Sequence, residues 1–164
     1  MCNNRTVTDK KNGSGAAFLL AQLGAHAASK FAERLTEIDL GPAHAGILRI
    51  LAATPAITQQ ALANALRTLP SRLVALVDEL EEKGLVERRA NENDRRSHAL
   101  HLTEKGRSTF QSLGRIAREH QKHLLAALSE EEQATLAELL QKVADQQGLV
   151  RHVHPGYARI GARK

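Results

Sequence analysis

Apolar residues recur at three- and four-residue spacing along most of the chain, which predicts a mostly helical protein. The predicted helices cover about 16–38, 42–54, 58–66, 70–83, 104–128 and 130–148. Pro42 and Pro70 fit first helical turns, where the missing N–H costs nothing, and Gly84 fits the position after a helix end. Thr58, Thr103 and Ser129 can cap the helices that follow them, and Ser129-Glu130-Glu131-Glu132 is a capping-box pattern.

The pattern changes after Gly84 to one typical of strands. Residues 85–89 and 97–102 alternate in strand fashion around the polar stretch 90–96, which predicts a β-hairpin with a charged tip. Just before the hairpin, the two short helices at 58–66 and 70–83 are joined by a tight turn. That geometry presents one helix end to a DNA major groove, and the hairpin would form a wing beside it.

The order and spacing of three segments in this region resemble the winged-helix signature of the MarR family of transcription regulators. The segments are Gly84-Leu85-Val86-Glu87-Arg88-Arg89, Asp94-Arg95-Arg96 and Leu102-Thr103-Glu104-Lys105-Gly106. With its flanking helices the resemblance covers roughly residues 16–148. It implies a mostly α fold, a winged helix-turn-helix with N- and C-terminal dimerisation helices and a two-stranded β-wing.

The domain organisation follows from this resemblance and from composition. We expect a flexible N-terminal arm (1–15), a MarR-like domain (16–148) and a basic C-terminal tail (149–164). Within the domain, the winged unit would span about 42–103, and the dimerisation helices about 16–38 and 104–148. In MarR-like proteins these outer helices interlock across a two-fold axis, so the resemblance implies a homodimer.

Net charge says little about DNA binding in this chain. Of the total of +5, the first 15 residues carry +2 and the last 16 carry +4, which leaves −1 for the domain between them. The indication of nucleic-acid binding is instead local, because arginines gather within the winged motif. They are Arg67, Arg72, Arg88, Arg89, Arg95 and Arg96.

Ser71 and Arg72 open the second helix of the motif, and Val74 and Ala75 lie on its adjoining exposed turn. The Arg72 guanidinium can fork onto the O6 and N7 atoms of a guanine, and the alternative is contact with phosphate or solvent alone. Many family members carry a Thr-x-x-Arg-type pair where Arg72 and Ala75 stand. The resemblance therefore implies that the arginine here has moved one turn towards the N-terminus.

At the wing tip, Asp94 and Arg96 match the Asp-x-Arg pair of the family, in which the aspartate orients an arginine that enters the minor groove. Arg95 is the expected phosphate partner, and the alternative is a solvated hairpin tip. Further backbone contacts are expected from Gln59, Gln60, Arg67, Thr68, Arg88 and Arg89. Thr68 is also the expected N-cap of the second helix, because the aspartate frequent in this turn is absent.

A small-molecule pocket between the dimerisation helices and the DNA-binding lobe is the other feature that the resemblance implies. Candidate ligands for a small anionic or aromatic effector there are His26, Lys30, Arg34, His44 and Arg49. His120 and His123 stand three apart and raise the question of a metal site with His26 and His44. Their scattering predicts no bound metal, because zinc requires closely clustered ligands. Cys2 lies in the N-terminal arm and is interpreted as an incidental thiol.

Together these observations predict a homodimeric, sequence-specific, double-stranded-DNA-binding transcription regulator with a near-palindromic operator. The resemblance favours a repressor that a small ligand releases from DNA. The alternative is a winged-helix module that binds another protein. No phosphate loop, nucleophile elbow or His-Glu-x-x-His run indicates an enzyme, and no cofactor is expected. Without a signal or membrane segment, the expected location is the cytoplasm.

Overall fold

The computed structural model describes residues 15–91 and 94–150, with the side chains of 91–97 excepted. The described helices are α1 (Ala16–Leu35), the 3-10 helix η1 (Thr36–Ile38), α2 (Pro42–Ala53), α3 (Gln59–Leu66), α4 (Pro70–Glu82), α5 (Glu104–Leu124) and α6 (Glu130–Gln146). The strands are β1 (Ile57–Thr58), β2 (Val86–Asn91) and β3 (Asp94–Leu102). The mostly helical fold class is thereby confirmed. The predicted helix 16–38 is divided, because the α-helix α1 ends at Leu35 and the last three residues form the 3-10 helix η1.

The helix starts follow the residues that the sequence singles out. The Thr58 hydroxyl accepts a hydrogen bond from the Ala61 N–H, and Thr103 accepts one from Gly106 N–H at 2.9 Å. Ser129 and Glu132 form the reciprocal capping box. Gly84 ends α4 with φ of +69°, a left-handed conformation that glycine adopts without a Cβ penalty.

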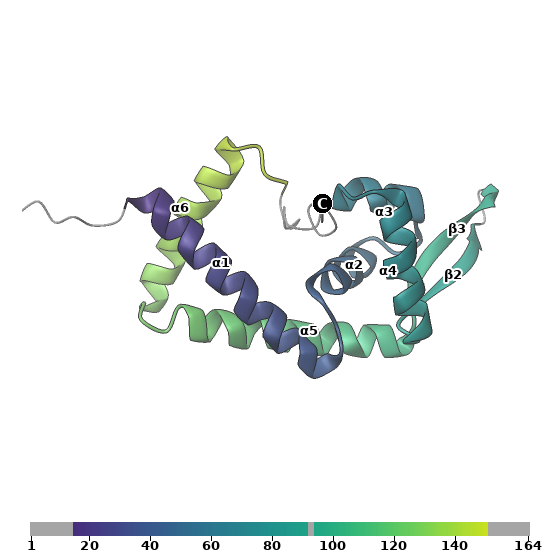
Figure 1. The fold of residues 1–164 in the computed structure, drawn as a ribbon, viewed down its shortest axis with the longest axis horizontal. Coiled ribbons are helices and arrows are strands. Elements are labelled where there is room, and N and C mark those ends of the chain that lie inside the picture. The colour runs from purple at the N-terminus through teal and green to yellow at the C-terminus, as the bar shows by residue number, and fades with distance from the viewer. Residues whose placement is uncertain (1–14, 92–93, 151–164) are drawn as a thin grey trace, which may run out of the picture.

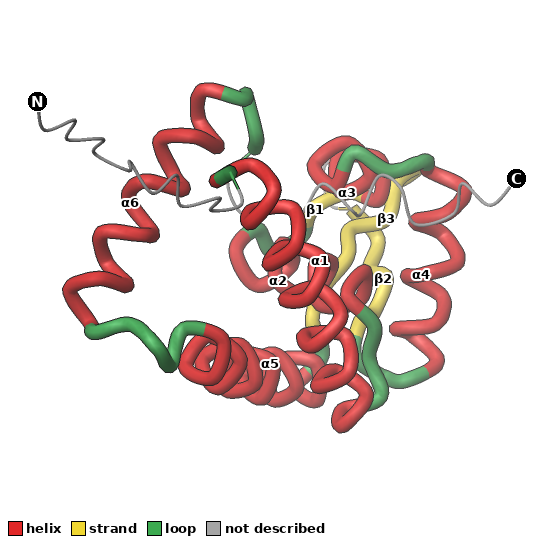
Figure 2. Tube along the Cα trace, turned by 60° about the vertical axis from the view of Figure 1, so that its left-hand side comes forward, coloured by secondary structure: helices red, strands yellow, loops and turns green. Residues whose placement is uncertain are grey.

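The sheet has three antiparallel strands in the order β1-β3-β2, one more than the predicted two-stranded wing. The hairpin β2–β3 pairs Val86 with Leu102, and the short β1 pairs Ile57 with Leu100. Figure 2 shows the three strands beside α3 and α4, away from α6. Through this third strand, the segment just before α3 pairs with β3 at the base of the wing.

Two clusters of buried residues hold the chain together. The larger one lies inside the winged unit, where α2, α3, α4 and the sheet bury leucine, isoleucine and valine side chains such as Leu48, Leu62 and Leu73. The smaller one joins the end of α1 to α2 and α5 through Leu35, Ala45, Leu113 and Ile116. Each fully buried Leu or Ile contributes about 1.5–3 kcal/mol, so the winged unit holds most of the hydrophobic stabilisation.

The long helix α5 runs between the two ends of the molecule (Figure 1). The winged unit lies at one end, and the N-terminal half of α1 lies with α6 at the other. Among the residues the structure describes, α6 has none that is buried, although it carries an apolar face. In the same part of the chain, no helix is both long and apolar enough to cross a membrane.

Candidate DNA-binding site

The helix α4 presents one exposed face at its N-terminal end. Ser71, Val74 and Ala75 are exposed there, whereas Leu73, Val77 and Leu80 on the opposite face are fully buried. Arg72 is half-buried at the edge of the exposed face. The first N–H groups of a helix carry partial positive charge, so this end suits contact with a phosphate-lined groove.

The turn before α4 differs from the predicted one. Thr68 does not cap α4, because the N-cap position is Leu69 and no side chain caps it. Arg67 instead adopts a left-handed conformation with φ of 51°, and the Thr68 N–H closes the turn onto the Ala63 carbonyl at 3.0 Å. Arg67 therefore occupies the backbone conformation that a glycine adopts most easily. The prediction of a Thr68 cap is wrong.

Leu69 is a feature that the sequence did not single out. Its side chain is 71% exposed at the N-terminus of α4, next to the exposed face of Ser71 and Val74. An apolar side chain so placed is suited to contact with a thymine methyl group or a deoxyribose. Its exposure depends on the turn geometry, which the local sequence did not reveal.

Arg88 is held inside the winged unit rather than directed at a phosphate. Its guanidinium donates to Asp78 at 2.6 Å, to Glu81 and, at 3.4 Å, to Gln59 Oε1. The Arg88 backbone N–H also donates to Glu81 at 3.1 Å, and the side chain is only 24% exposed. Arg88 thus joins the wing strand β2 to α4 and α3, at odds with its predicted backbone contact to DNA. Gln59 is engaged in the same cluster.

Replacing Arg88 with methionine is expected to lower the free energy of unfolding by about 1–3 kcal/mol, because two carboxylates one helical turn apart would lose their shared counterion. Urea unfolding followed by circular dichroism measures the change. The control is Arg89→Met, since Arg89 is exposed and pairs with its neighbour Glu87 on the same strand, and its replacement should change stability by less than about 0.5 kcal/mol. Equal effects of both substitutions would contradict the role assigned to Arg88.

The wing-tip side chains Asp94, Arg95 and Arg96 lie outside the described residues. Their backbone belongs to β3, and Asn91 pairs with Asp94 across the hairpin. The sequence-based roles of these three residues therefore stay predictions. The N-terminal arm with Cys2 and the tail from residue 151 also lie outside the described part of the chain.

The five predicted effector ligands divide into two groups. His26, Lys30 and Arg34 line one pocket between α1 and α5 together with His120, His123 and Leu124. His44 does not join them, because its Nδ1 accepts the Gly41 N–H at 3.2 Å and its Nε2 lies 2.9 Å from Glu79. Arg49 is exposed on α2 and lines neither of the pockets described here.

A larger pocket of about 420 Å³ lies between α2, the base of the wing and α5. Its walls combine apolar groups with an arginine, a histidine and an amide; the lining residues are Leu51, Ala52, Pro55, His101, Leu102, Arg107, Phe110 and Gln111. Arg107 donates to the Leu102 carbonyl at 2.9 Å, so its charge is held at the junction of wing and helix. Sequence reasoning missed this pocket, because its walls come from three distant segments. No group of three His, Cys, Asp or Glu within the described ranges is placed to bind a metal.

Comparison with known proteins identifies the fold. Residues 38–97 match the sequence model of the MarR family. A putative transcriptional regulatory protein for the hcr operon of Thauera aromatica is 33% identical over 115 residues, which cover 70% of this chain and 69% of that protein. The chain belongs to the MarR family. It is a winged helix-turn-helix transcriptional regulator of that family, as the sequence resemblance predicted.

Two solved MarR-family structures with DNA superpose on this chain. The transcriptional repressor CouR bound to a 23-mer DNA duplex is 30% identical with a TM-score of 0.70, and the match covers 79% of this chain and 92% of CouR. A mutant MarR from E. coli complexed with operator DNA is 27% identical with a TM-score of 0.66, over 77% of this chain and 91% of that chain. The likeness spans the helices beyond the winged unit as well as the winged unit itself.

Proposed function

We propose that this protein is a homodimeric regulator that binds a near-palindromic operator in double-stranded DNA. The exposed N-terminal face of α4, flanked by the hairpin β2–β3, is the observation that carries the proposal. A helix end with exposed small and apolar side chains fits into a major groove, and the hairpin then lies over the adjacent minor groove. CouR bound to a DNA duplex and MarR complexed with operator DNA share this fold, which supports double-stranded DNA as the partner.

Within this proposal, Arg72 contacts a base edge while Ser71, Val74 and Ala75 line the groove beside it. Arg67 and Thr68, in the turn before α4, are proposed to contact the DNA backbone. For the wing tip, the predicted contacts of Asp94, Arg95 and Arg96 are retained on sequence grounds. Arg88 is instead assigned a positioning role, because its carboxylate partners hold the wing against α4.

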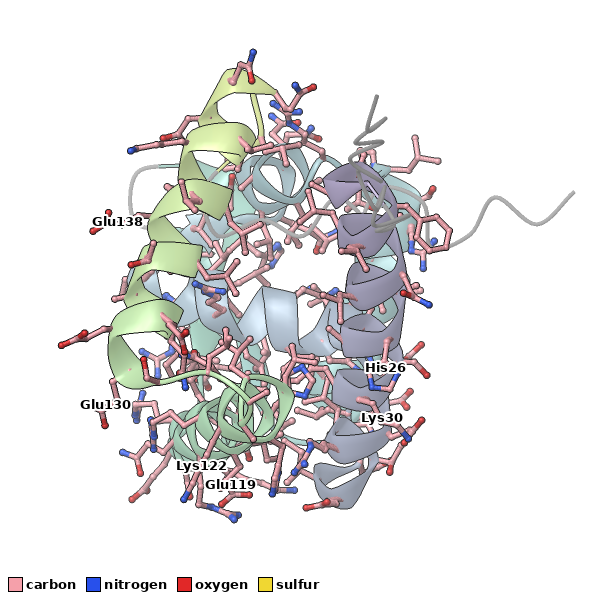
Figure 3. The ribbon with its side chains drawn as sticks, turned by 90° about the vertical axis from the view of Figure 1, so that its left-hand side faces the viewer. His26, Lys30, Glu119, Lys122, Glu130 and Glu138 are labelled. Carbon is pink, nitrogen blue, oxygen red and sulfur yellow. The ribbon has the colours of Figure 1, made fainter. Side chains whose placement is uncertain are left out.

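The dimer is proposed from the apolar surface at the end opposite the winged unit. Phe18 and Leu23 on α1 are 59% and 55% exposed, and Leu139 on α6 is 53% exposed. Viewed from this end, α1 and α6 stand apart on opposite sides of the molecule (Figure 3). An amphipathic helix without buried residues gains its stability from a partner surface, and a second copy supplies a matching one across a two-fold axis. The sequence-based assignment of residues about 16–38 and 104–148 to the dimer interface is therefore kept as part of this proposal.

Effector control is proposed to act through the pocket between α2, the wing base and α5. A ligand there would contact both the winged unit and α5, which belongs to the proposed dimer interface. It could therefore change the spacing between the two copies of α4 in the dimer. Apolar walls with Arg107 suit a small aromatic acid. A screen of small acids for release of the bound operator tests this proposal of effector control. A screen in which no acid releases the operator would contradict it.

The Arg72→Ala variant is expected to weaken operator binding by about 1–3 kcal/mol, because a bidentate contact to a base edge is lost. The measurement is fluorescence anisotropy with DNA from immediately upstream of the gene, over a salt series. Wild-type affinity should fall steeply with salt. The logarithm of the binding constant should decrease with the logarithm of the salt concentration, with a slope of about −0.9 for each phosphate neutralised. The control is Arg118→Ala, an exposed arginine on α5 outside the winged unit.

Equal binding by wild type and Arg72→Ala would contradict the proposed contact between Arg72 and a base edge. Weak binding with little dependence on salt would contradict DNA binding itself and favour the protein-interaction alternative. Steep salt dependence without preference for sequence would leave a DNA-binding protein whose operator lies elsewhere. No catalytic step is assigned to any residue.

A further inference from the structure

Leu69 is the most exposed large apolar side chain in the described part of the protein. It occupies the N-cap position of α4 and is 71% exposed. Apart from Leu69 and Val74, the exposed large apolar side chains of the described residues lie on α1, on α6 or directly after α6. Because α4 lies away from α6 and from the N-terminal half of α1 (Figure 1), the proposed dimer surface does not account for the exposure of Leu69.

The presence of a leucine at this position leaves α4 without a side-chain cap. The helices α3, α5 and α6 each begin after a hydroxyl side chain that accepts a backbone N–H, whereas no side chain caps α4. Leucine is among the least favourable N-cap residues, because it has no acceptor for the first N–H groups of the helix. Neither capping nor burial therefore explains Leu69, whereas contact with a partner would.

The apolar surface continues from Leu69 onto the first turns of α4. Pro70 and Val74 are exposed and stand four residues apart, so they lie on the same side of the helix. Pro70 has no N–H. The N–H groups of Arg72 and Leu73 both donate to the Leu69 carbonyl, at 3.1 Å. Leu69, Pro70 and Val74, which we call the apolar tip, therefore lie where α4 offers few backbone donors.

The polar side chains around the apolar tip have other roles. Ser71 is exposed beside it, and Arg72 is half-buried at the edge of the exposed face. Further along that face, the Asp78 carboxylate accepts a hydrogen bond from Arg88 at 2.6 Å. Hydrogen bonds to bases can therefore come from Ser71 and Arg72, while the apolar tip is suited to recognise an apolar group.

We propose that the apolar tip recognises the C5-methyl group of thymine in the major groove, with Leu69 as the specificity-determining residue. This methyl group is the apolar feature that distinguishes thymine from the other three bases there. Packing of the methyl group against Leu69 removes apolar surface of both from water. The inference rests on the proposed binding of α4 in the major groove, and it adds a preference for thymine to the base contact proposed for Arg72.

Deoxyuridine isolates the contribution of the methyl group, because uracil keeps the hydrogen-bonding atoms of thymine and lacks only that group. Fluorescence anisotropy compares a duplex from immediately upstream of the gene with the same duplex synthesised with deoxyuridine in place of every thymidine. Loss of one buried methyl contact weakens binding about fourfold, and the two half-sites multiply this effect. Wild type should therefore bind the deoxyuridine duplex about tenfold or more weakly. If the upstream DNA does not bind, a duplex that the protein selects from a random pool replaces it.

Two variants at one position assign the effect to Leu69. Leu69→Ser removes the apolar side chain and supplies an N-cap hydroxyl, so its midpoint of urea unfolding should equal or exceed that of wild type. It should bind the thymidine duplex about tenfold or more weakly, with less than about a threefold difference between the two duplexes. The matched control Leu69→Met keeps an apolar side chain of similar volume and should retain the wild-type preference for the thymidine duplex.

Loss of the thymidine preference in Leu69→Ser but not in Leu69→Met would support the proposal. Equal binding of the two duplexes by wild type would overturn it and leave DNA binding intact. Weaker binding by Leu69→Ser with the full thymidine preference would also overturn it and would place Leu69 against deoxyribose. Unchanged binding by Leu69→Ser would overturn it in favour of a protein partner for this side chain. Failure to bind any duplex, selected ones included, would contradict operator binding itself.

Discussion

Replacing Gly106 with alanine is expected to lower the free energy of unfolding by about 2 kcal/mol or more, even though alanine is the better helix former. Gly106 is buried in the first turn of α5, where a Cβ would overlap the Leu85 carbonyl oxygen and lie 3.0 Å from its carbonyl carbon. The Leu85 oxygen already accepts the Thr103 N–H at 3.1 Å, and Thr103 Oγ1 donates to the Gly84 carbonyl at 2.7 Å. Backbone on both sides fixes this contact, so rotation of a side chain cannot relieve it.

Urea unfolding at fixed protein concentration measures this change, because a dimer's stability depends on its concentration. The matched control is Gly114→Ala in the same helix. There a Cβ would meet only the flexible end of Arg118, at 3.4 Å, and the variant should be as stable as wild type or more stable by up to about 1 kcal/mol. An unchanged midpoint for Gly106→Ala would show that the α5 start can move away from Leu85.

The Gly106 contact also explains why the end of the wing and the start of α5 behave as one unit. Thr103 caps α5 through its hydroxyl while its N–H and hydroxyl hold the residues just after α4. The segment Leu102–Gly106 thus connects β3, α4 and α5 at one point. This connection and the packing of α2 on α5 are therefore two routes by which a movement of α5 reaches the winged unit.

Features that depend on a few neighbouring residues were predictable from the sequence. The capping residues Thr58, Thr103 and Ser129 and the left-handed Gly84 are local, and the structure confirms each of them. The third strand was missed because Ile57–Thr58 is too short to show a period of two. The prediction of a Thr68 cap was wrong because Arg67 adopts the left-handed conformation after α3 and Leu69 takes the N-cap position of α4.

Features that depend on partners far along the chain were not predictable in the same way. Arg88 appeared to be a surface cation, because nothing in the hairpin sequence shows that Asp78 and Glu81 face it from α4. The spacing of His26, Lys30 and Arg34 does predict a common helix face. Only the packing of α1 on α5 shows that His120 and His123 complete that surface, whereas His44 is directed at Glu79.

The Leu23→Glu variant is expected to dissociate the proposed dimer and abolish tight operator binding. Leu23 is 55% exposed on α1, in a stretch where the described residues from 15 to 26 are all exposed within one chain. Burial of a leucine contributes about 1.5–3 kcal/mol, and two-fold symmetry doubles the effect of one substitution. Loss of roughly 3–6 kcal/mol corresponds to dimer association weakened about a hundredfold or more.

Analytical ultracentrifugation over a range of concentrations measures the association, and anisotropy with operator DNA measures the consequence. The control is Ala21→Glu, which adds the same charge two residues away, on nearly the opposite face of α1. A monomeric Leu23→Glu protein should retain the winged unit, because the core that contains Leu48, Leu62 and Leu73 does not involve α1. It should also retain weak, salt-sensitive binding to half of the operator, since one recognition helix remains intact. A Leu23→Glu protein that stays dimeric would place the interface elsewhere and leave the exposed surfaces of α1 and α6 in need of another partner.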